Sequence, residues 1–210
     1  MTIQDVKDLV ITGKAKKVAA AAQAALDEGI NAQELLTAMI DAMGEVGDKF
    51  SRNEIFVPEM LVAAKAMKKG VEVLKPHLGS GEIGAMGKMI MGTVKDDLHD
   101  IGKNLVIMMI ESAGFEVIDL GVDVPAQTFV DTYNANPDTK IIGLSALLTT
   151  TMPQLQEAVA LINEQPWRSN VKVMVGGAPI TQEFADKIGA DAYTTDAASA
   201  AQKAKELVTE

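Results

Sequence analysis

The chain has 210 residues, 48% hydrophobic and 23% charged, which is the composition of one large or two small globular domains with a sizeable core. Its 19 basic and 29 acidic residues leave a formal net charge of −10, which argues against nucleic acid or an anionic membrane as a partner. The absence of cysteine excludes disulfides, thiolate zinc sites, iron–sulfur clusters and cysteine nucleophiles, and without a secretion signal or a membrane-length apolar run we expect a cytoplasmic protein.

Residues 1–76 are predicted to form a bundle of four helices. Apolar residues recur there at helical spacing in four segments, at residues 2–11, 13–28, 31–50 and 58–76. Asn31 with Glu34 three positions later has the pattern of a helix start, and Pro58 suits the first turn of the last helix. Short connections between amphipathic helices are typical of a bundle.

Residues 77–87 are predicted to be a linker between two domains. The segment is rich in glycine, at Gly79, Gly81, Gly84 and Gly87, and it lacks the periodicity of a helix or a strand. His77 lies at its start and is interpreted as a surface residue.

Residues 88–210 alternate between predicted strands and helices. Short apolar runs predict strands at 89–94, 116–120, 141–146, 171–175 and 192–193. The stretches between and after them predict helices at 100–113, 126–135, 152–164, 181–188 and 197–208. Five such units imply an α/β domain with a five-stranded, parallel, doubly wound, Rossmann-like sheet.

The loop after the first of these strands carries the most informative residues of the chain. Asp97 and His99 lie in it, and Gly102 follows in the first turn of the next helix. An imidazole beside a carboxylate is the arrangement of a metal ligand with its orienting partner, although a single Asp-x-His is also common in ordinary polar loops. Ligands of open parallel sheets bind at the carboxyl ends of strands, where this loop is expected.

Candidate site residues, many of them small or with a hydroxyl group, follow the other strands as well. They are Asp123 after the second strand, Ser145, Leu147 and Thr149 after the third, Gly176 and Gly177 after the fourth, and Thr194 to Asp196 after the fifth. Any one of these groups of residues would be ordinary in a turn. Together on one sheet edge, around one histidine that can bind a metal, they predict a site for a large ligand.

These residues carry a resemblance to a known family. Asp97-x-His99-x-x-Gly102, Ser145-x-Leu147 and Gly176-Gly177 resemble the signature of the cobalamin-binding domain, which cobalamin-dependent methionine synthase and the cobalamin-dependent mutases share. Residues 43–50 and 57–60 resemble the helical cap of the methyltransferase branch. A cap at 1–76 followed by a cobalamin domain at 88–210 is similar to the stand-alone corrinoid proteins of methylamine and methanol methyltransferase systems.

The resemblance implies a cofactor and a role for each motif residue. The cofactor would be cobalamin or a related corrinoid, with His99 as the lower axial ligand of cobalt in place of the nucleotide base. Asp97 would accept a hydrogen bond from the other ring nitrogen, and Ser145 would bond to Asp97 and complete a relay. The channel for the displaced nucleotide tail would be lined by Gly102, Leu147, Thr149, Gly176 and Gly177. On the bundle, Met43 and Phe50 are our candidates for the face over the corrin ring.

The activity that the resemblance implies is that of a methyl carrier, the corrinoid subunit of a multi-component methyltransferase rather than a complete enzyme. Cobalt(I) would take a methyl group from a substrate on a barrel-type partner methyltransferase. The resulting methylcobalamin, a cobalt(III) species, would pass it to a thiol such as coenzyme M, or to tetrahydrofolate, on a second methyltransferase. A reductive activase would be a further partner. Such systems serve one-carbon metabolism in methanogenesis or acetogenesis, and the donor stays open among methylamines, methanol, betaines and methoxyaromatics.

Three other interpretations stay open at this point. A cobalamin-dependent sensor that regulates transcription would need a basic DNA-binding element, which the acidic chain does not show. The small subunit of a cobalamin-dependent mutase would share the motif but is not expected to carry the four-helix cap. A phospho-receiver domain would need an aspartate at a strand end, for which Asp123 is the candidate.

Overall fold

The computed structural model describes residues 1–78 and 86–209. By their internal contacts these residues divide into two compact units, the first containing helices α1 to α4 and the second containing the sheet. The predicted linker at 77–87 falls mostly on residues 79–85, outside the described residues. Within the described ranges, no helix is both long and apolar enough to cross a membrane.

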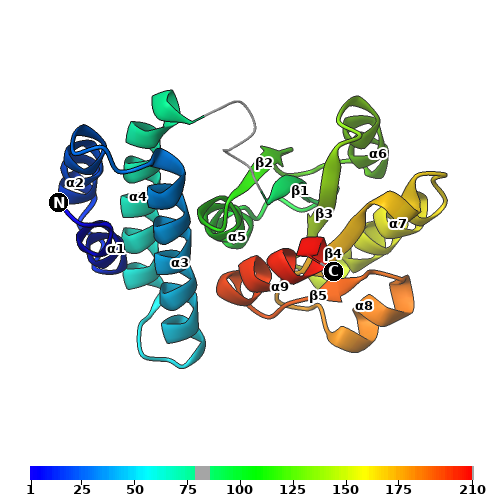
Figure 1. The fold of residues 1–210 in the computed structure, drawn as a ribbon. Helices are drawn as coiled ribbons and strands as arrows, with labels where there is room; N and C mark the ends of the chain where they lie inside the picture. Colours follow the sequence, from blue (N-terminus) through cyan, green and yellow to red (C-terminus); the bar gives the residue numbers. More distant parts are fainter. Residues whose placement is uncertain (79–85, 210) are drawn as a thin grey trace. The chain divides into compact units, whose positions relative to one another are not determined.

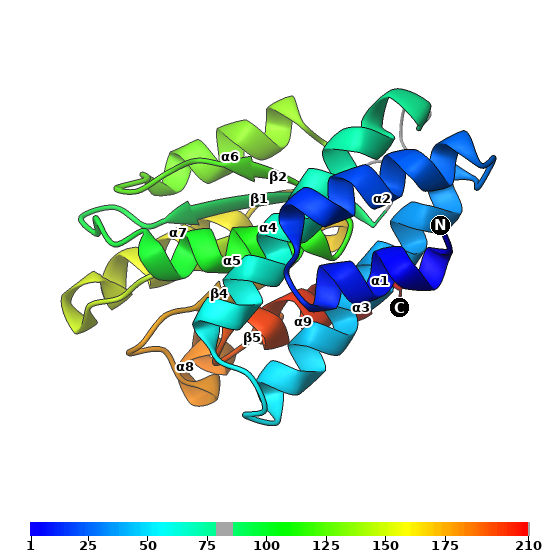
Figure 2. The same ribbon diagram turned by 90° about the vertical axis from the view of Figure 1, so that its left-hand side faces the viewer.

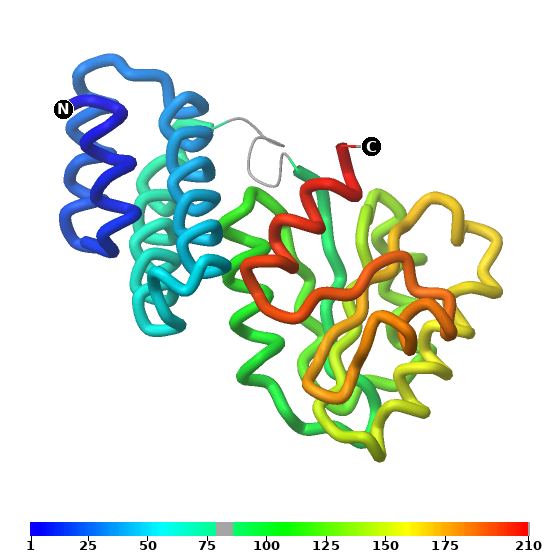
Figure 3. Tube along the Cα trace, turned by 90° about the horizontal axis from the view of Figure 1, so that it is seen from below, coloured from blue at the N-terminus to red at the C-terminus, as the bar shows by residue number. Residues whose placement is uncertain are grey.

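The first unit is the predicted helical bundle. Its helices are α1 (Ile3–Ile11), α2 (Ala15–Asp27), α3 (Ala32–Ser51) and α4 (Val57–Leu74), and the short 3₁₀ turn η1 (Lys75–His77) follows. Figure 3 shows the four helices lying side by side. Asn31 caps α3 as predicted, because its side-chain oxygen accepts hydrogen bonds from the backbone N–H groups of Gln33 and Glu34.

Methionine side chains fill much of this bundle's interior. Met39 and Met60 are fully buried, and Met43 retains only 3% of its surface, whereas Phe50 is half-buried. Gly70 lets the helices approach closely, since a Cβ atom there would lie 2.8 Å from Cγ1 of Val18 and would overlap Cε of Met39. These methionines thus form part of the bundle's core, and of the two candidate cap residues Phe50 keeps more exposed surface than Met43.

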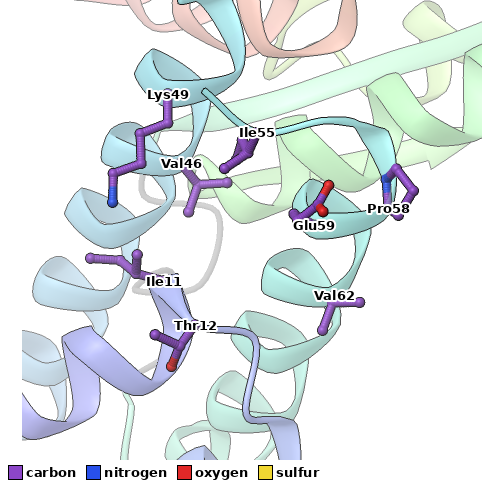
Figure 4. Close-up of a pocket in the computed structure, with 8 residues that line it drawn as sticks. All are labelled: Ile11, Thr12, Val46, Lys49, Ile55, Pro58, Glu59 and Val62. Carbon is purple, nitrogen blue, oxygen red and sulfur yellow. The ribbon is translucent and has the colours of Figure 1, made fainter. Parts of the chain in front are cut away.

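One open pocket of this unit lies between the end of α1, the last turns of α3 and the start of α4 (Figure 4). Its lining is mostly apolar: Ile11, Thr12, Val46, Lys49, Ile55, Pro58, Glu59 and Val62. The Glu59 carboxylate is already used, because its Oε2 accepts the backbone N–H of Phe56 at 3.1 Å and caps α4. Val46, Lys49, Pro58 and Glu59 belong to the two segments, 43–50 and 57–60, that carry the resemblance to a helical cap.

The second unit is built on a parallel sheet of five strands, as predicted. The strands are β1 (Gly87–Thr93), β2 (Phe115–Asp119), β3 (Thr139–Ser145), β4 (Lys172–Gly176) and β5 (Ala192–Tyr193). Their spatial order is β2-β1-β3-β4-β5, and every neighbouring pair is parallel. From β1 the chain moves to β2 at one edge of the sheet, and from β3 it continues toward β4 and β5 at the other. The strand order therefore reverses between β1 and β3, and open parallel sheets bind ligands at such a point.

Helices cover both faces of this sheet. They are α5 (Ile101–Ser112), α6 (Ala126–Ala135), α7 (Met152–Asn163), α8 (Gln182–Ile188) and α9 (Ala197–Thr209), with 3₁₀ turns η2 (Thr149–Thr151) and η3 (Arg168–Asn170). Figure 1 shows α5 and α9 on one side and α6, α7 and α8 on the other, and Figure 2 looks onto the α5 and α9 side. Ile90, Ile142 and Leu144 join the core under α6 to α8, and the strands are accordingly apolar on both faces.

The register of the strands brings their carboxyl ends to one edge. Thr93 pairs with Ser145, Ser145 pairs with Gly176, and Val175 pairs with Tyr193. The loops that follow β1, β3, β4 and β5 therefore leave the sheet together. This edge is where the sequence motifs were expected to meet.

Candidate functional site

His99 and Asp97 form a hydrogen-bonded pair in the loop between β1 and α5. Nδ1 of His99 lies 2.8 Å from Oδ1 of Asp97, and the same oxygen accepts the backbone N–H of His99 at 3.1 Å. The Asp97 side chain is fully buried, whereas 48% of the His99 side chain is exposed. Because a carboxylate only accepts hydrogen bonds, Nδ1 carries the proton and Nε2 is left with the lone pair that could bind a metal.

The second oxygen of Asp97 is held by the segment after β3. Oδ2 accepts a hydrogen bond from Oγ1 of Thr151 at 2.7 Å and another from the backbone N–H of Leu147 at 2.8 Å. Burial alone would raise the pKa of Asp97, but the hydrogen bonds from Leu147, Thr151 and His99 favour the anion and hold that pKa well below its usual range. Asp97 is therefore a fixed negative charge beneath an exposed imidazole.

The hydroxyl that contacts Asp97 is that of Thr151, which corrects the prediction for Ser145. Ser145 is the last residue of β3 and pairs with Thr93 and Gly176, and among the described residues no hydrogen bond joins its hydroxyl to Asp97. The 3₁₀ turn η2 carries the chain back over the strand end, so that its last residue, Thr151, reaches the carboxylate. The available sequence signal was the run of threonines at 149–151 after the third strand, of which Thr151 comes just before the predicted helix at 152–164.

Other predicted residues lie on the same edge. Leu147 contributes its backbone N–H to Asp97, and 40% of the residue is exposed. Thr149 is exposed at the start of η2. Gly102 is exposed in the first turn of α5, and a Cβ atom on it would meet nothing within 4 Å, so a ligand can approach its backbone directly.

The two glycines at the end of β4 have different surroundings. Gly177 has φ +126°, and a Cβ atom there would overlap the carbonyl oxygen of Ala146 and lie 2.7 Å from its carbonyl carbon. Only glycine fits between β4 and the end of β3 at this position. Gly176 has more room, since the nearest atom to its Cβ position is the carbonyl oxygen of Thr194 at 3.7 Å.

The surroundings of His99 suit a metal that arrives inside a large apolar ring. Four large hydrophobic residues with exposed surface lie in the loop of this pair and in the segment after β3 that holds Asp97: Leu98 (73% exposed), Ile101 (85%), Leu147 (40%) and Leu148 (40%). Exposed apolar groups gathered in this way mark a binding surface. Within the described ranges no group of three or more His, Cys, Asp or Glu side chains could hold a metal ion, so one imidazole would complete a metal whose other donors come with the ligand.

Comparisons with known proteins identify this ligand. Residues 87–202 match a family described as "B12 binding domain", and residues 2–75 match a second family of the same description. Dimethylamine corrinoid protein 1 of Methanosarcina acetivorans is 46% identical over 208 residues, a match that spans 98% of this chain and 97% of that protein.

Two solved structures extend the likeness over the whole chain. A cobalamin-binding protein from Desulfitobacterium hafniense DCB-2 has a TM-score of 0.83 at 29% identity, covering 98% of both chains. A chain of the methanol:cobalamin methyltransferase complex MtaBC from Methanosarcina barkeri has a TM-score of 0.85 at 27% identity, covering 99% of this chain and 79% of that one. The protein therefore belongs to the family of methylamine-type corrinoid proteins, in which a helical unit and a Rossmann-like B12-binding domain take cobalamin or a related corrinoid as cofactor.

Proposed function

We propose that the protein carries methyl groups from dimethylamine on its corrinoid, between a methyltransferase that binds the amine and a second one that binds the acceptor. The observation that carries this proposal is the pair of His99 and Asp97 at the sheet edge, in a chain 46% identical to a dimethylamine corrinoid protein. When bound, the corrinoid supplies a cobalt centre that accepts and releases a methyl group.

The residues of the loop would each have a defined part in holding that cofactor. Nε2 of His99 would bind the cobalt. Asp97 keeps the proton on Nδ1, and its negative charge makes the imidazole a stronger donor. Thr151 and Leu147 hold the Asp97 carboxylate in place from below.

The other residues at the edge would receive the rest of the corrinoid. We place the displaced nucleotide tail between the segments that contain Ser145, Thr149, Gly176 and Gly177, with Gly102 near its entrance. Support comes from the register that joins Ser145 to Gly176 and from the open space around Gly102 and Gly176. Because Thr151 and not Ser145 bonds to Asp97, the Ser145 hydroxyl would be available to this tail.

The domain division and the partners are part of the same proposal. Residues 1–76 would act as a cap over the upper face of the corrinoid, joined by a linker at 77–87 to the binding domain at 88–210. The partners would be a barrel-type methyltransferase for the amine, a second methyltransferase for coenzyme M or tetrahydrofolate, and a reductive activase. The likeness to a chain of a methyltransferase complex supports the first of these.

A reconstituted assay tests the proposal. The protein is loaded with hydroxocobalamin and mixed, under reducing conditions, with a dimethylamine methyltransferase and a methyltransferase for coenzyme M. We expect monomethylamine and methyl-coenzyme M to form in equal amounts from dimethylamine, and neither to form without this protein. The variant His99→Ala is the control for the cofactor loop. Equal turnover with methanol through a methanol methyltransferase, and none with dimethylamine, would contradict the proposed donor.

A further inference from the structure

Two aspartates near His99 have an unusual backbone conformation. Asp96 has φ +66° and Asp123 has φ +54°, and in the described part of the chain Asn53 is the only other non-glycine residue with positive φ. Aspartate tolerates this left-handed region better than most residues but is still disfavoured there. Strained residues that persist beside a site are held by their surroundings, so their contacts are informative.

Asp123 makes two hydrogen bonds to the loop that contains His99. Its Oδ1 accepts the backbone N–H of Asp96 at 2.7 Å, and its own N–H donates to the carbonyl oxygen of Asp97 at 2.9 Å. The residue comes from the segment between β2 and α6, in which Val124 also forms an isolated bridge with Val94, the residue that follows β1. One side of the loop is therefore fastened to the neighbouring strand connection.

Gln154 of α7 fastens the same aspartate from another element. Its Nε2 donates to Oδ2 of Asp96 at 3.1 Å, while its Oε1 is buried without a partner within the described residues. A buried acceptor without a partner is unfavourable, so the amide is placed for its contact with Asp96 and not for its own solvation. Asp96 thus lies between two elements, with its N–H held by one and its carboxylate by the other.

The far end of the loop is also tied down. Thr93, which is fully buried, donates from Oγ1 to the carbonyl oxygen of His99 at 2.9 Å. The backbone before and after Asp97 is therefore fixed independently of the hydrogen bonds that its carboxylate makes. Those bonds orient the imidazole ring, whereas the contacts of Asp96 and Thr93 set where the ring stands above the sheet edge.

We propose that Asp123 is a positioning residue, which acts through its hydrogen bond with Asp96 and holds the His99 loop where His99 can bind the cobalt. Gln154, which also bonds to Asp96, acts together with it. This inference rests on the proposed function, in which Nε2 of His99 binds the cobalt. Asp96, Asp97 and Asp123 bring three carboxyl groups into one short region, and like charges disfavour such a cluster. The cluster persists because one oxygen of Asp123 and one of Asp96 each accept a hydrogen bond that the loop would otherwise lack.

Substitutions at Asp123 separate the hydrogen bond from the backbone strain. Asp123→Gly removes the acceptor for the Asp96 N–H but suits the left-handed conformation, whereas Asp123→Asn keeps an acceptor oxygen and also tolerates that conformation. Asp138→Gly is the matched control, because it removes a carboxylate that pairs with Lys88 at 3.0 Å and lies just before β3, at the other end of the sheet.

The first measurement is the EPR spectrum of the cobalt(II) form after loading with hydroxocobalamin. A nitrogen coupling that changes from a triplet to a doublet when the protein is labelled with ¹⁵N comes from a histidine ligand. We expect this coupling in the wild type, in Asp123→Asn and in Asp138→Gly. In Asp123→Gly we expect the ratio of His-ligated to unligated cobalt to fall roughly 10-fold, the size of effect typical for residues that orient a ligand.

The second measurement needs no cofactor. Amide hydrogen exchange at Asp96 in the unloaded protein reports the tie itself, and we expect it to be about 10-fold faster in Asp123→Gly than in Asp123→Asn. If Asp123→Gly does not fold, Gln154→Met removes the other tie to Asp96 and is expected to shift the spectrum in the same direction.

The outcomes distinguish the positioning role of Asp123 from the ligand role of His99. Histidine coupling at wild-type strength in Asp123→Gly, or in Gln154→Met where that variant replaces it, would overturn the positioning role and leave the proposed function intact. A wild-type protein that binds corrinoid without any histidine coupling would overturn the ligand role of His99, and the positioning role with it. Unchanged exchange at Asp96 in Asp123→Gly would show that the hydrogen bond does not hold the loop.

Discussion

At the scale of single residues, the site depends on one buried charge. Asp97 has no exposed surface and is surrounded by donors from two segments of the chain. A buried carboxylate without such partners would be protonated or would destabilise the fold. Because its partners are His99, Leu147 and Thr151, the charge joins the loop after β1 to the segment after β3 and at the same time sets the tautomer of the imidazole.

The first prediction concerns Thr151 and uses the unloaded protein. We expect Thr151→Val to lower the free energy of unfolding by about 1.5–3 kcal/mol at pH 7, since it removes a buried hydrogen bond to a charged group. The folded-state pKa of Asp97 is lowered, so the stability from its ionised form is fully present above its unfolded pKa of about 3.9 and is lost as the pH falls toward the folded-state value. The difference between wild type and variant should therefore narrow below about pH 4.

Denaturant titrations across this pH range provide the check, with Ser145→Ala as the matched control. Ser145 makes no hydrogen bond to Asp97 among the described residues, so its removal should cost less and show no such pH trend. A larger loss in Ser145→Ala than in Thr151→Val would mean that Ser145 supports the carboxylate after all.

At the scale of elements, the packing of the bundle depends on where glycine lies in its helices. Gly70 stands in α4 where a Cβ atom would overlap Met39 and come within 2.8 Å of Val18, whereas a Cβ atom on Gly44 in α3 would meet nothing within 4 Å. The first glycine is required by helix–helix contact. The second costs helix stability without a packing reason in this unit.

The second prediction follows from this contrast. Gly70→Ala should destabilise the protein, because overpacking costs about 1–3 kcal/mol and outweighs a gain of about 1 kcal/mol in helix propensity. Gly44→Ala should gain most of that roughly 1 kcal/mol, since its side chain enters open space. Thermal unfolding of both variants is the measurement, and a stabilising Gly70→Ala would show that Met39 and Val18 move aside freely.

At the scale of the whole molecule, the third prediction concerns the two units. If the four helices cap the bound corrinoid, they shield its light-sensitive methyl form. A chain of residues 86–210, shown to be folded by circular dichroism, should still bind the corrinoid through the His99 loop but should lose its methyl group under illumination faster than the full chain. The control is the full chain with Phe56→Asn, which changes one exposed side chain of the bundle and keeps the helices. Equal photolysis rates in the full chain and the isolated unit would argue against a cap.

The sequence by itself determined the fold class, and it located the loop that carries the proposed cobalt ligand. Helical spacing in the first third and alternating strands and helices in the rest are local patterns, and the strands and helices of the structure follow them to within a few residues. The edge of the sheet at which the motifs meet followed from the rule for parallel strands, and the pairing of Thr93 with Ser145 and of Ser145 with Gly176 bears this out. The contact between Asp97 and His99 joins residues only two positions apart, so it could also be predicted from the sequence.

Only the tertiary structure decided which distant groups reach that pair. Thr151 replaces Ser145 on Asp97 because a 3₁₀ turn after β3 changes which side chain faces the carboxylate, and periodicity does not register such a turn. The contacts of Asp123 and Gln154 with Asp96 join segments 27 and 58 positions apart, and the left-handed conformations that allow the first of them have no sequence pattern in aspartate. Spacing along the chain sets local geometry, but the partners of a buried charge are chosen by the packing of separate elements around it.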